Sequence, residues 1–261
     1  MNEAPRPRKA RYAVEVSHVR RLTPRMVRVT FTGDALAAFA WNGPAAHIKL
    51  IFEGDDAAAS AGPREPAPRP VMRTYTPRRF DAQARELVVD MVIHGAGPAS
   101  AWASRASVGQ RLTIAGPGRK YQVDGAADWY LLAGDDTAIP AIGTILEALP
   151  PKVRALVLLE VVDASEEHPI DARGDATQVH WLHRGPDPAG AGQPLEAAVR
   201  RIELPSGTGA VYVACESEAM RRIRRHLLHE RQLPRTQLVT RGYWRLGETD
   251  HPDRDYGEDV G

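Results

Sequence analysis

The stretch Arg73-Thr74-Tyr75-Thr76-Pro77 is the most informative part of this chain, and His94-Gly-Ala-Gly-Pro-Ala-Ser-Ala-Trp102 follows it. An aromatic ring flanked by hydroxyl and guanidinium groups can cover a flat redox ring and hydrogen-bond to its edge. A glycine-rich turn that leads into a short helix, with proline near the first helical position, can hold a diphosphate. Either motif alone is typical of an ordinary strand or turn. Together, in this order, they predict a flavin site.

Composition limits the class of protein. The 261 residues suit one large domain or two of ordinary size, and 43% hydrophobic with 26% charged residues is typical of a globular chain. The net charge of +1 gives no argument for nucleic acid or a membrane surface as partner. Cys215 is the single cysteine, which excludes an intramolecular disulfide and a cysteine-ligated metal cluster. Without a signal or membrane-spanning pattern, the chain is expected to be cytoplasmic.

The first half of the chain reads as short strands separated by turns. Alternating apolar residues such as Tyr12, Val14 and Val16 predict half-buried strands. The predicted strands lie within 11–52 and at 73–76, 86–93 and 111–115, with one short helix at about 98–105. Such a set predicts a closed antiparallel β-barrel. We assign residues 1–120 to this domain and expect residues 54–70 to form a mobile loop.

The second half has a different pattern. Short apolar runs at 129–133 and 155–162 predict strands, and the unbroken run at 155–162 is typical of a strand buried on both faces. Residues 178–183, 209–215 and 237–244 can supply further strands. Helices are expected from the Gly134-Asp-Asp-Thr137 loop to about Leu149 and at 218–232. Strands alternating with helices predict a parallel α/β sheet. This domain is assigned to residues 121–247, and residues 248–261 are an acidic tail that we expect to be mobile.

The α/β half lacks the G-x-G-x-x-G fingerprint of dinucleotide-binding folds. It has instead a loop in which Gly134 permits a sharp exit from the strand. Thr137 could cap the following helix or donate to a phosphate. Ligands of open α/β sheets bind beyond the carboxyl ends of the strands, where this loop lies. A capped helix without a ligand is the alternative.

The chain closely resembles the siderophore-interacting proteins, flavin-dependent ferric-siderophore reductases of the ferredoxin–NADP reductase superfamily. The resemblance spans residues 12–247. It rests on Leu22-Thr-Pro24, Arg28-Val-Thr-Phe-Thr-Gly33, the two motifs quoted above, Gly116-Pro117, Ala133-Gly-Asp-Asp-Thr-Ala-Ile-Pro-Ala141, Glu160-Val161, Cys215-Glu-Ser217 and Gly242-Tyr-Trp-Arg-Leu-Gly247. It implies an FAD-binding barrel followed by a Rossmann-like domain that binds NADPH or NADH.

The resemblance also implies roles for the residues of the barrel. Tyr75 packs on the isoalloxazine ring and Thr76 hydrogen-bonds near N5, so these two are the residues expected to act in catalysis. Arg73 approaches the diphosphate. The remaining FAD contacts fall on the second motif, at His94, Gly97, Pro98, Ala99, Ser100 and Trp102.

The nicotinamide donor is implied to enter at the α/β half and to pass a hydride to the flavin. The residues expected there are Gly134, Asp135, Thr137, Cys215 and Glu216. Relatives commonly carry glycine where this chain has Cys215, and we interpret that cysteine as a packing residue. Acids at residues 163–168 favour NADH over NADPH, while the resemblance favours NADPH and Ser165 or Arg184 could serve a 2′-phosphate.

Ferric siderophores are often anionic, so the resemblance implies a basic substrate pocket with Lys49, Arg119 and Arg245 at its mouth. No metal site is expected. His226 and His229 are interpreted as surface residues, and the arginines at 221–225 as a solvated helix face. The chain is expected to act as a monomer. Two alternatives stay open: a general flavin or ferric-chelate reductase, and a siderophore and flavin carrier that ferredoxin reduces.

Overall fold

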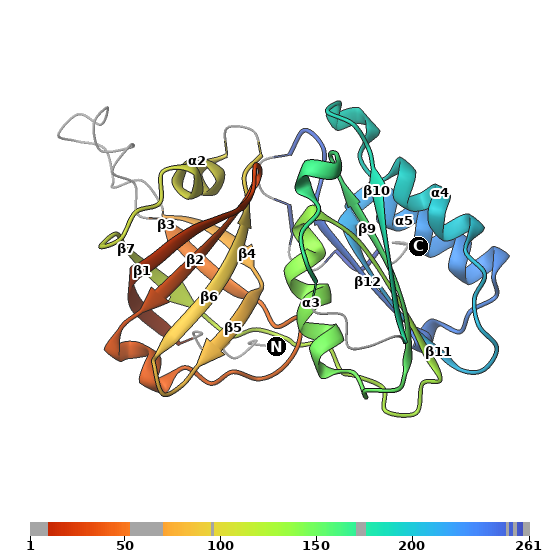
Figure 1. The fold of residues 1–261 in the computed structure, drawn as a ribbon, viewed down its shortest axis with the longest axis horizontal. Helices are drawn as coiled ribbons and strands as arrows, with labels where there is room; N and C mark the ends of the chain where they lie inside the picture. The colour runs from red at the N-terminus through yellow and green to blue at the C-terminus, as the bar shows by residue number, and fades with distance from the viewer. Residues whose placement is uncertain are drawn as a thin grey trace, which may run out of the picture. The chain divides into compact units, whose positions relative to one another are not determined.

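A computed structural model describes residues 10–52, 70–94, 97–170, 176–248, 251–252 and 255–257. The chain folds into two compact units (Figure 1). The first contains residues 1–20 and 27–120, and the second contains residues 21–26 and 121–261. Most of the loop expected at 54–70 lies outside the described residues.

The first unit is built on a seven-stranded sheet in the order β4-β3-β7-β1-β2-β6-β5. Its elements are β1 (Arg11–Thr23), β2 (Met26–Thr32), β3 (Ile48–Phe52), β4 (Val71–Tyr75), β5 (Pro77–Asp81), β6 (Glu86–Val92), α2 (Pro98–Ser104) and β7 (Arg111–Ala115). The strand pairs β1–β7, β3–β4, β3–β7 and β5–β6 are antiparallel. The terminal strands β4 and β5 are joined through Thr76 alone, so the sheet has to curl until its two ends meet. The prediction of an antiparallel barrel is confirmed, in the form of a curled half-barrel.

Period-2 alternation explains this core. Val14, Val16, Val29 and Phe31 are all buried and pack in one cluster. The intervening residues of β2 are half-buried or charged, as expected for a sheet with one face toward the core. Among them, Arg28 meets Asp90 on β6 in a bidentate ion pair with Nε–Oδ1 of 2.6 Å.

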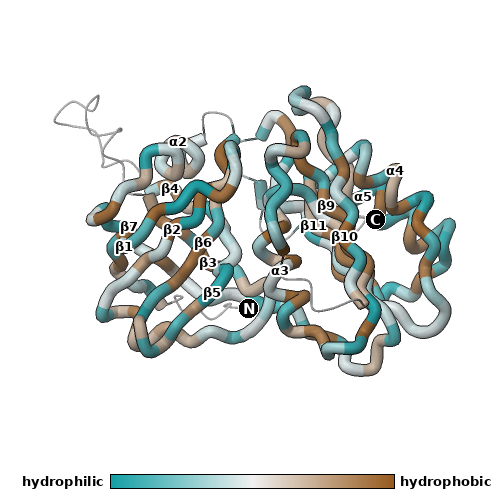
Figure 2. Tube along the Cα trace, viewed as in Figure 1, coloured by the Kyte–Doolittle hydropathy of each residue, from teal (hydrophilic) through white to brown (hydrophobic). Residues whose placement is uncertain are grey.

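The second unit is a five-stranded parallel sheet in the order β10-β9-β8-β11-β12. Its elements are β8 (Trp129–Asp135), α3 (Ile139–Ala148), β9 (Arg154–Val161), β10 (Thr177–His183), α4 (Gln193–Arg201), β11 (Gly209–Glu216), α5 (Ser217–Arg225) and β12 (Leu238–Trp244). Helix α3 covers one face of the sheet, and α4 and α5 cover the other (Figure 1). The central strands β8 and β11 are buried along their whole length, which explains their continuous apolar sequence (Figure 2).

The secondary structure differs from the sequence-based expectation in three places. Strand β5 and helix α4 were not predicted, and the helix expected at 218–232 changes at His226 into a π-helical turn that ends at Glu230. His226 and Arg224, expected on the surface, are buried. Arg224 donates to Thr240 Oγ1 on β12 at 3.2 Å, and His226 Nδ1 lies 3.1 Å from Arg200 Nη1 on α4.

The acidic tail also differs from expectation. Its described residues are held against α5 and β12, where the Gly242 amide donates to the Asp255 carbonyl at 2.8 Å. Asp255 accepts a hydrogen bond from Arg221 at 2.9 Å, and the Arg241 guanidinium lies 4.2 Å from the centre of the Tyr256 ring. The Gly242 amide, on the terminal strand β12, is thereby satisfied by the tail.

Candidate functional site

Strand β4 presents Arg73 and Tyr75 on one face and Thr74 on the other. In the antiparallel register Tyr75 lies opposite Ile48 and Arg73 opposite Leu50. Since Ile48 and Leu50 point into the core, Arg73 and Tyr75 share the core side of the sheet. Both are half-buried because β4 is a terminal strand. The motif therefore places an aromatic ring and a guanidinium side by side at a sheet edge.

Tyr75 packs against the core cluster, and burial raises the pKa of its phenol well above the ordinary value of 10.0, an effect that Arg73 partly offsets. The phenol is therefore neutral at physiological pH. Thr76 is buried at the junction of β4 and β5. A hydroxyl at this junction can donate to a group that lies along the terminal strand.

In the second motif, residues 98–102 belong to α2 and Gly97 is the residue before this helix. Ser100 is buried, and its Oγ accepts a hydrogen bond from the His94 amide at 2.8 Å. This bond links the His94 backbone to α2, so the Ser100 oxygen is already engaged by a backbone amide. Pro98 occupies the first turn of α2, where it costs no hydrogen bond. An added Cβ at Gly97 would meet no atom within 4 Å, so the loop has open space beside it.

Two residues of the same motif lie in the core. Ala99 is buried, and Trp102 packs on Phe31 with ring centres 6.2 Å apart and on Phe52 at 5.7 Å. Their structural role is therefore visible, and their predicted contact with FAD stays a prediction. The donor set as a whole fits a flavin dinucleotide: an aromatic ring and a cation on a terminal strand, a hydroxyl at its end, and open space beside Gly97.

The predicted substrate residues Lys49 and Arg119 both belong to the first unit. Lys49 lies opposite Thr74 and Ala115 on the outward face, and its Nζ donates to Thr74 Oγ1 at 2.6 Å. Arg119 is exposed just beyond the end of β7. The loop before it is fixed because the Gly118 amide donates to the His47 carbonyl at 2.6 Å. Asn42 Nδ2 also donates to the Gly118 carbonyl, at 2.8 Å.

The second unit has a candidate site of its own, at the carboxyl edge of the parallel sheet. The strand order reverses between β8 and β11, and ligands of open α/β sheets bind at such a switch point. Gly134 lies at the end of β8, where an added Cβ would lie 2.5 Å from Ala138 Cβ and 2.7 Å from the Ala214 carbonyl. Only glycine permits this close approach of loop to strand.

Asp135 and Glu216 end the two strands at the switch point, and both are buried. Asp135 Oδ1 accepts from the Thr137 amide at 3.0 Å and from Thr137 Oγ1 at 2.5 Å. Glu216 Oε2 accepts from the amides of Glu218 and Ala219 at 2.8 and 2.9 Å and so caps α5. The amides at both helix starts are therefore already engaged by carboxylates.

This finding changes the interpretation of two residues. Asp135, and not Thr137, caps the turn after β8, so the interpretation of Thr137 as a helix cap was wrong. The Thr137 hydroxyl donates its hydrogen bond to Asp135. Cys215 is fully buried, and burial raises the pKa of its thiol well above 9.0. A buried, protonated thiol agrees with the interpretation of Cys215 as a packing residue.

Sequence reasoning missed three further groups at this edge. Trp244 donates from Nε1 to Asp135 Oδ2 at 2.7 Å, Asp136 pairs with Arg184 at 2.6 Å, and Glu160 accepts from the amides of Gly192 and Leu195. The signal that could have found the acids is their position: Asp136 directly follows β8, and Glu160 is the next-to-last residue of β9, after a run of apolar residues. Arg184 is committed to Asp136 and lies 3.9 Å from Glu160, which opposes its suggested role with a 2′-phosphate.

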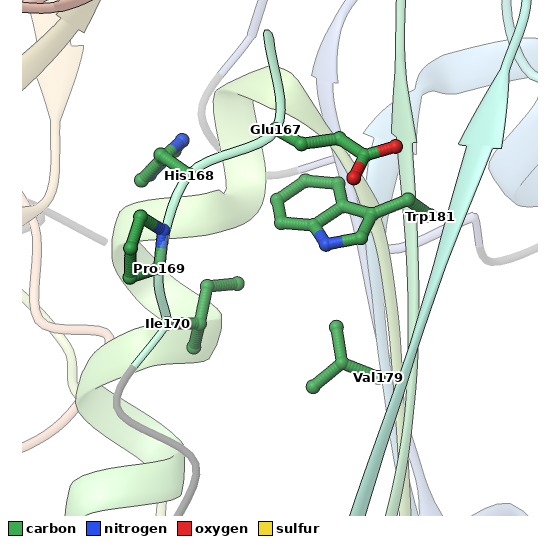
Figure 3. A pocket seen from close by; sticks show the side chains of 6 residues that line it. All are labelled: Glu167, His168, Pro169, Ile170, Val179 and Trp181. Carbon is green, nitrogen blue, oxygen red and sulfur yellow. The ribbon is translucent and has the colours of Figure 1, made fainter. Parts of the chain in front are cut away.

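Arg245 is exposed and pairs with two acids, at 2.9 Å with Glu218 and at 3.5 Å with Glu248. A separate pocket of about 370 Å³ opens between β10 and the segment 167–170 (Figure 3). It is lined by Glu167, His168, Pro169, Ile170, Val179 and Trp181. None of the predicted site residues lines it.

Within the described ranges there is no group of three or more His, Cys, Asp or Glu side chains placed to hold a metal ion. The described helices also include none with the length and apolar character needed to cross a bilayer.

Comparison with known proteins covers both units. A family model described as a siderophore-interacting FAD-binding domain matches residues 15–121, and one described as siderophore-interacting protein matches residues 127–247. Ferric vibriobactin reductase ViuB of Vibrio cholerae is 34% identical over 240 residues, covering 88% of this chain and 87% of its own. The NADPH-dependent ferric-chelate reductase of Escherichia coli is 29% identical over 262 residues, covering 94% and 99%.

Solved structures agree with this assignment. A siderophore utilization protein from T. fusca superposes with a TM-score of 0.84 at 37% identity, over 94% of this chain and 96% of its own. A ferredoxin NADP⁺ reductase from Neisseria gonorrhoeae, at 14% identity and a TM-score of 0.63, shows the shared fold alone. On the strength of these matches along nearly its full length, the chain belongs to the siderophore-interacting protein family.

Proposed function

We propose that this protein reduces siderophore-bound Fe(III) to Fe(II) with NADPH or NADH as electron donor and FAD as resident cofactor. The observation that carries the proposal is the placement of Arg73 and Tyr75 on one face of the terminal strand β4. This strand lies in the unit that matches a siderophore-interacting FAD-binding domain. The names of the relatives, ferric vibriobactin reductase and ferric-chelate reductase, support the same reaction class.

In this proposal the barrel residues bind and orient the flavin. Tyr75 covers the ring with a neutral phenol, Thr76 donates to its edge, and Arg73 offsets the charge of the diphosphate. The segment from His94 to Trp102 holds the diphosphate and the adenosine, and the hydrogen bond from the His94 amide to Ser100 Oγ links the described ends of this segment. FAD, when bound, supplies the chemistry that converts a two-electron donor into a one-electron donor.

The remaining residues place the donor and the substrate. We assign the donor to the carboxyl edge of the parallel sheet, near Gly134, Asp135, Thr137, Cys215 and Glu216. Lys49, Arg119 and Arg245 attract the anionic ferric siderophore. Fe(II) is a poorer match than Fe(III) for hard oxygen donors, so reduction releases the metal. The proposal places the reaction in the cytoplasm, in a monomer with domains at residues 1–120 and 121–247.

Anaerobic mixing of FAD-saturated protein with NADPH or NADH tests the proposal. Loss of flavin absorbance, followed by its return and by trapped Fe(II) when ferric siderophore is added, would support it and identify the donor. Flavin that binds but stays oxidised with both nucleotides would favour a carrier that ferredoxin reduces. Reduction of any ferric chelate at the same rate would favour a general ferric-chelate reductase.

Paired variants of Tyr75 test the flavin site itself. Tyr75→Phe keeps the ring and removes a hydroxyl that is neutral, so FAD affinity should stay near that of wild type. Tyr75→Ala removes the stacking surface, and we expect FAD to bind about tenfold less tightly. A tenfold change in Kd corresponds to about 1.4 kcal/mol, which is the size of one aromatic contact. Titration of flavin fluorescence measures both. Equal affinity in the two variants would exclude Tyr75 from the flavin site.

A further inference from the structure

One carboxylate joins the ends of three neighbouring strands at the switch point. Asp135, at the end of β8, accepts from the Glu216 amide on β11 at 3.1 Å and from Trp244 Nε1 on β12 at 2.7 Å through Oδ2. Its other oxygen accepts from the amide and hydroxyl of Thr137. All four contacts come from donors, so an ionised carboxylate satisfies them all, and neither a protonated acid nor an amide does.

A break in the strand register presents the Trp244 side chain to Asp135. Cys215 lies opposite Gly242, but Glu216 lies opposite Trp244, so Tyr243 is an extra residue in β12. Such a bulge redirects the side chain that follows it, and bulges are frequent beside functional sites. The bulge residue is itself fixed, because the hydroxyls of Tyr243 and Tyr212 lie 2.7 Å apart.

The segment after the bulge is held at two points by the switch-point acids. Trp244 is bound by Asp135, and the Leu246 amide lies 3.5 Å from Glu216 Oε1. Arg245, the predicted substrate residue, lies between these two anchors. The position of the predicted substrate cation therefore depends on the same carboxylates that shape the predicted donor site.

Charged groups around Asp135 come from several elements. Asp136 directly follows Asp135 in the chain, and its carboxylate is paired with Arg184, the residue after β10. Glu160, the next-to-last residue of β9, lies 3.9 Å from Arg184, and Cys215 and Glu216 lie on β11. Burial, and then Asp136, raise the pKa of Asp135 to about 7.

We propose that Asp135 is a positioning residue that acts through Trp244: its ionised carboxylate holds the indole and the ends of β8, β11 and β12 in the arrangement that binds the nicotinamide donor. This inference rests on the proposed function, since it names what sets donor affinity at that site. Protonation of Asp135 releases the indole, and donor binding weakens as the pH falls.

Equilibrium binding of NAD⁺ and NADP⁺ to the oxidised FAD-loaded protein, measured by calorimetry, tests the inference without turnover. Trp244→Phe removes the indole donor and keeps the ring, so we expect about a tenfold rise in Kd, as for one lost hydrogen bond to a charged group. Asp135→Asn should raise Kd at least as much. The double variant should be no weaker than Asp135→Asn, because Asp135 acts through Trp244. Trp181→Phe, on β10, is the matched control and should bind as wild type does.

A spectroscopic measurement separates positioning from loss of structure. The difference in fluorescence between wild type and Trp244→Phe should titrate with a midpoint near pH 7, and this titration should disappear in Asp135→Asn. Unchanged Kd in both single variants, or a Trp244 signal independent of pH between 5 and 9, would overturn the inference alone. Failure of wild type to bind either nucleotide would overturn the proposed donor as well.

Discussion

Arg245 Nη2 lies 2.9 Å from Glu218 Oε1, so the cation assigned to the ferric siderophore is already paired with a carboxylate of α5. Glu218 occupies the first turn of that helix, and its amide is held by Glu216. Both side chains of the pair are about half exposed, at 44% for Arg245 and 49% for Glu218. If Arg245 binds the ferric siderophore as proposed, an anionic substrate competes with Glu218 for it.

This competition predicts opposite effects of two substitutions. Arg245→Ala should raise KM for an anionic ferric siderophore, and Glu218→Gln should lower it by about two- to fivefold, the range for an exposed pair of up to about 1 kcal/mol. Steady-state reduction at low salt measures both, and Glu15→Gln is the control because Glu15 is an exposed acid paired with Arg111. A rise in KM for Glu218→Gln would contradict the competition.

The bidentate pair between Arg28 and Asp90 predicts a large stability effect in the first unit. The Asp90 side chain is only 2% exposed, so Arg28→Ala leaves a buried carboxylate without its partner. We expect a loss of about 3–5 kcal/mol in the free energy of unfolding, against less than about 1 kcal/mol for Arg111→Ala at an exposed pair. Urea unfolding measures both losses. The double variant Arg28→Met with Asp90→Leu should recover most of the difference, and equal losses in the two single variants would contradict the argument.

The strands of both sheets could be predicted because their burial leaves a local pattern. The strand expected at 111–115 is β7 itself, and the apolar runs at 129–133 and 155–162 correspond to β8 and β9. Strand β5 leaves no such pattern. It starts with Pro77 and is rich in arginine. It is only partly buried, because it is a terminal strand of the sheet.

The candidate site was predictable as a set of segments and not as a set of contacts. Gly134 and Asp135 could be placed at the end of a strand from the sequence alone. The hydrogen bond from Trp244 to Asp135 depends on a sheet order and a bulge that join residues 109 positions apart. The carboxylate caps at α5 and at the turn after β8 depend on side-chain direction, which a motif does not specify.

The close packing at Gly134 predicts that an added methyl group is not tolerated. In Gly134→Ala the Cβ would meet the Ala138 side chain and the Ala214 carbonyl, and the backbone cannot yield. We expect a loss of about 1–3 kcal/mol in unfolding free energy, as for other overpacked interiors. Gly125→Ala is the matched control, because its added Cβ would meet no atom within 4 Å. Comparable stability of the two variants would show that the loop after β8 can move away from β11.

The raised pKa of Asp135 predicts how stability depends on pH. The folded state holds this proton more tightly than the unfolded state, whose carboxyl has the ordinary pKa of 3.8, so ionisation of Asp135 in the folded protein is costly. Its contribution to stability is therefore greatest below pH 3.8, falls as the pH rises toward about 7, and is constant above that value.

Asp135→Asn removes this titration. The free energy of unfolding of wild type relative to Asp135→Asn should therefore fall by about 2–3 kcal/mol between pH 5 and pH 8. Urea unfolding followed by circular dichroism at both pH values measures the difference, and the comparison with the variant cancels the carboxylates of Glu196 and Glu230, whose pKa values are lowered by arginine partners. A difference that is independent of pH would show that the four donors around Asp135 keep its carboxylate ionised throughout this range.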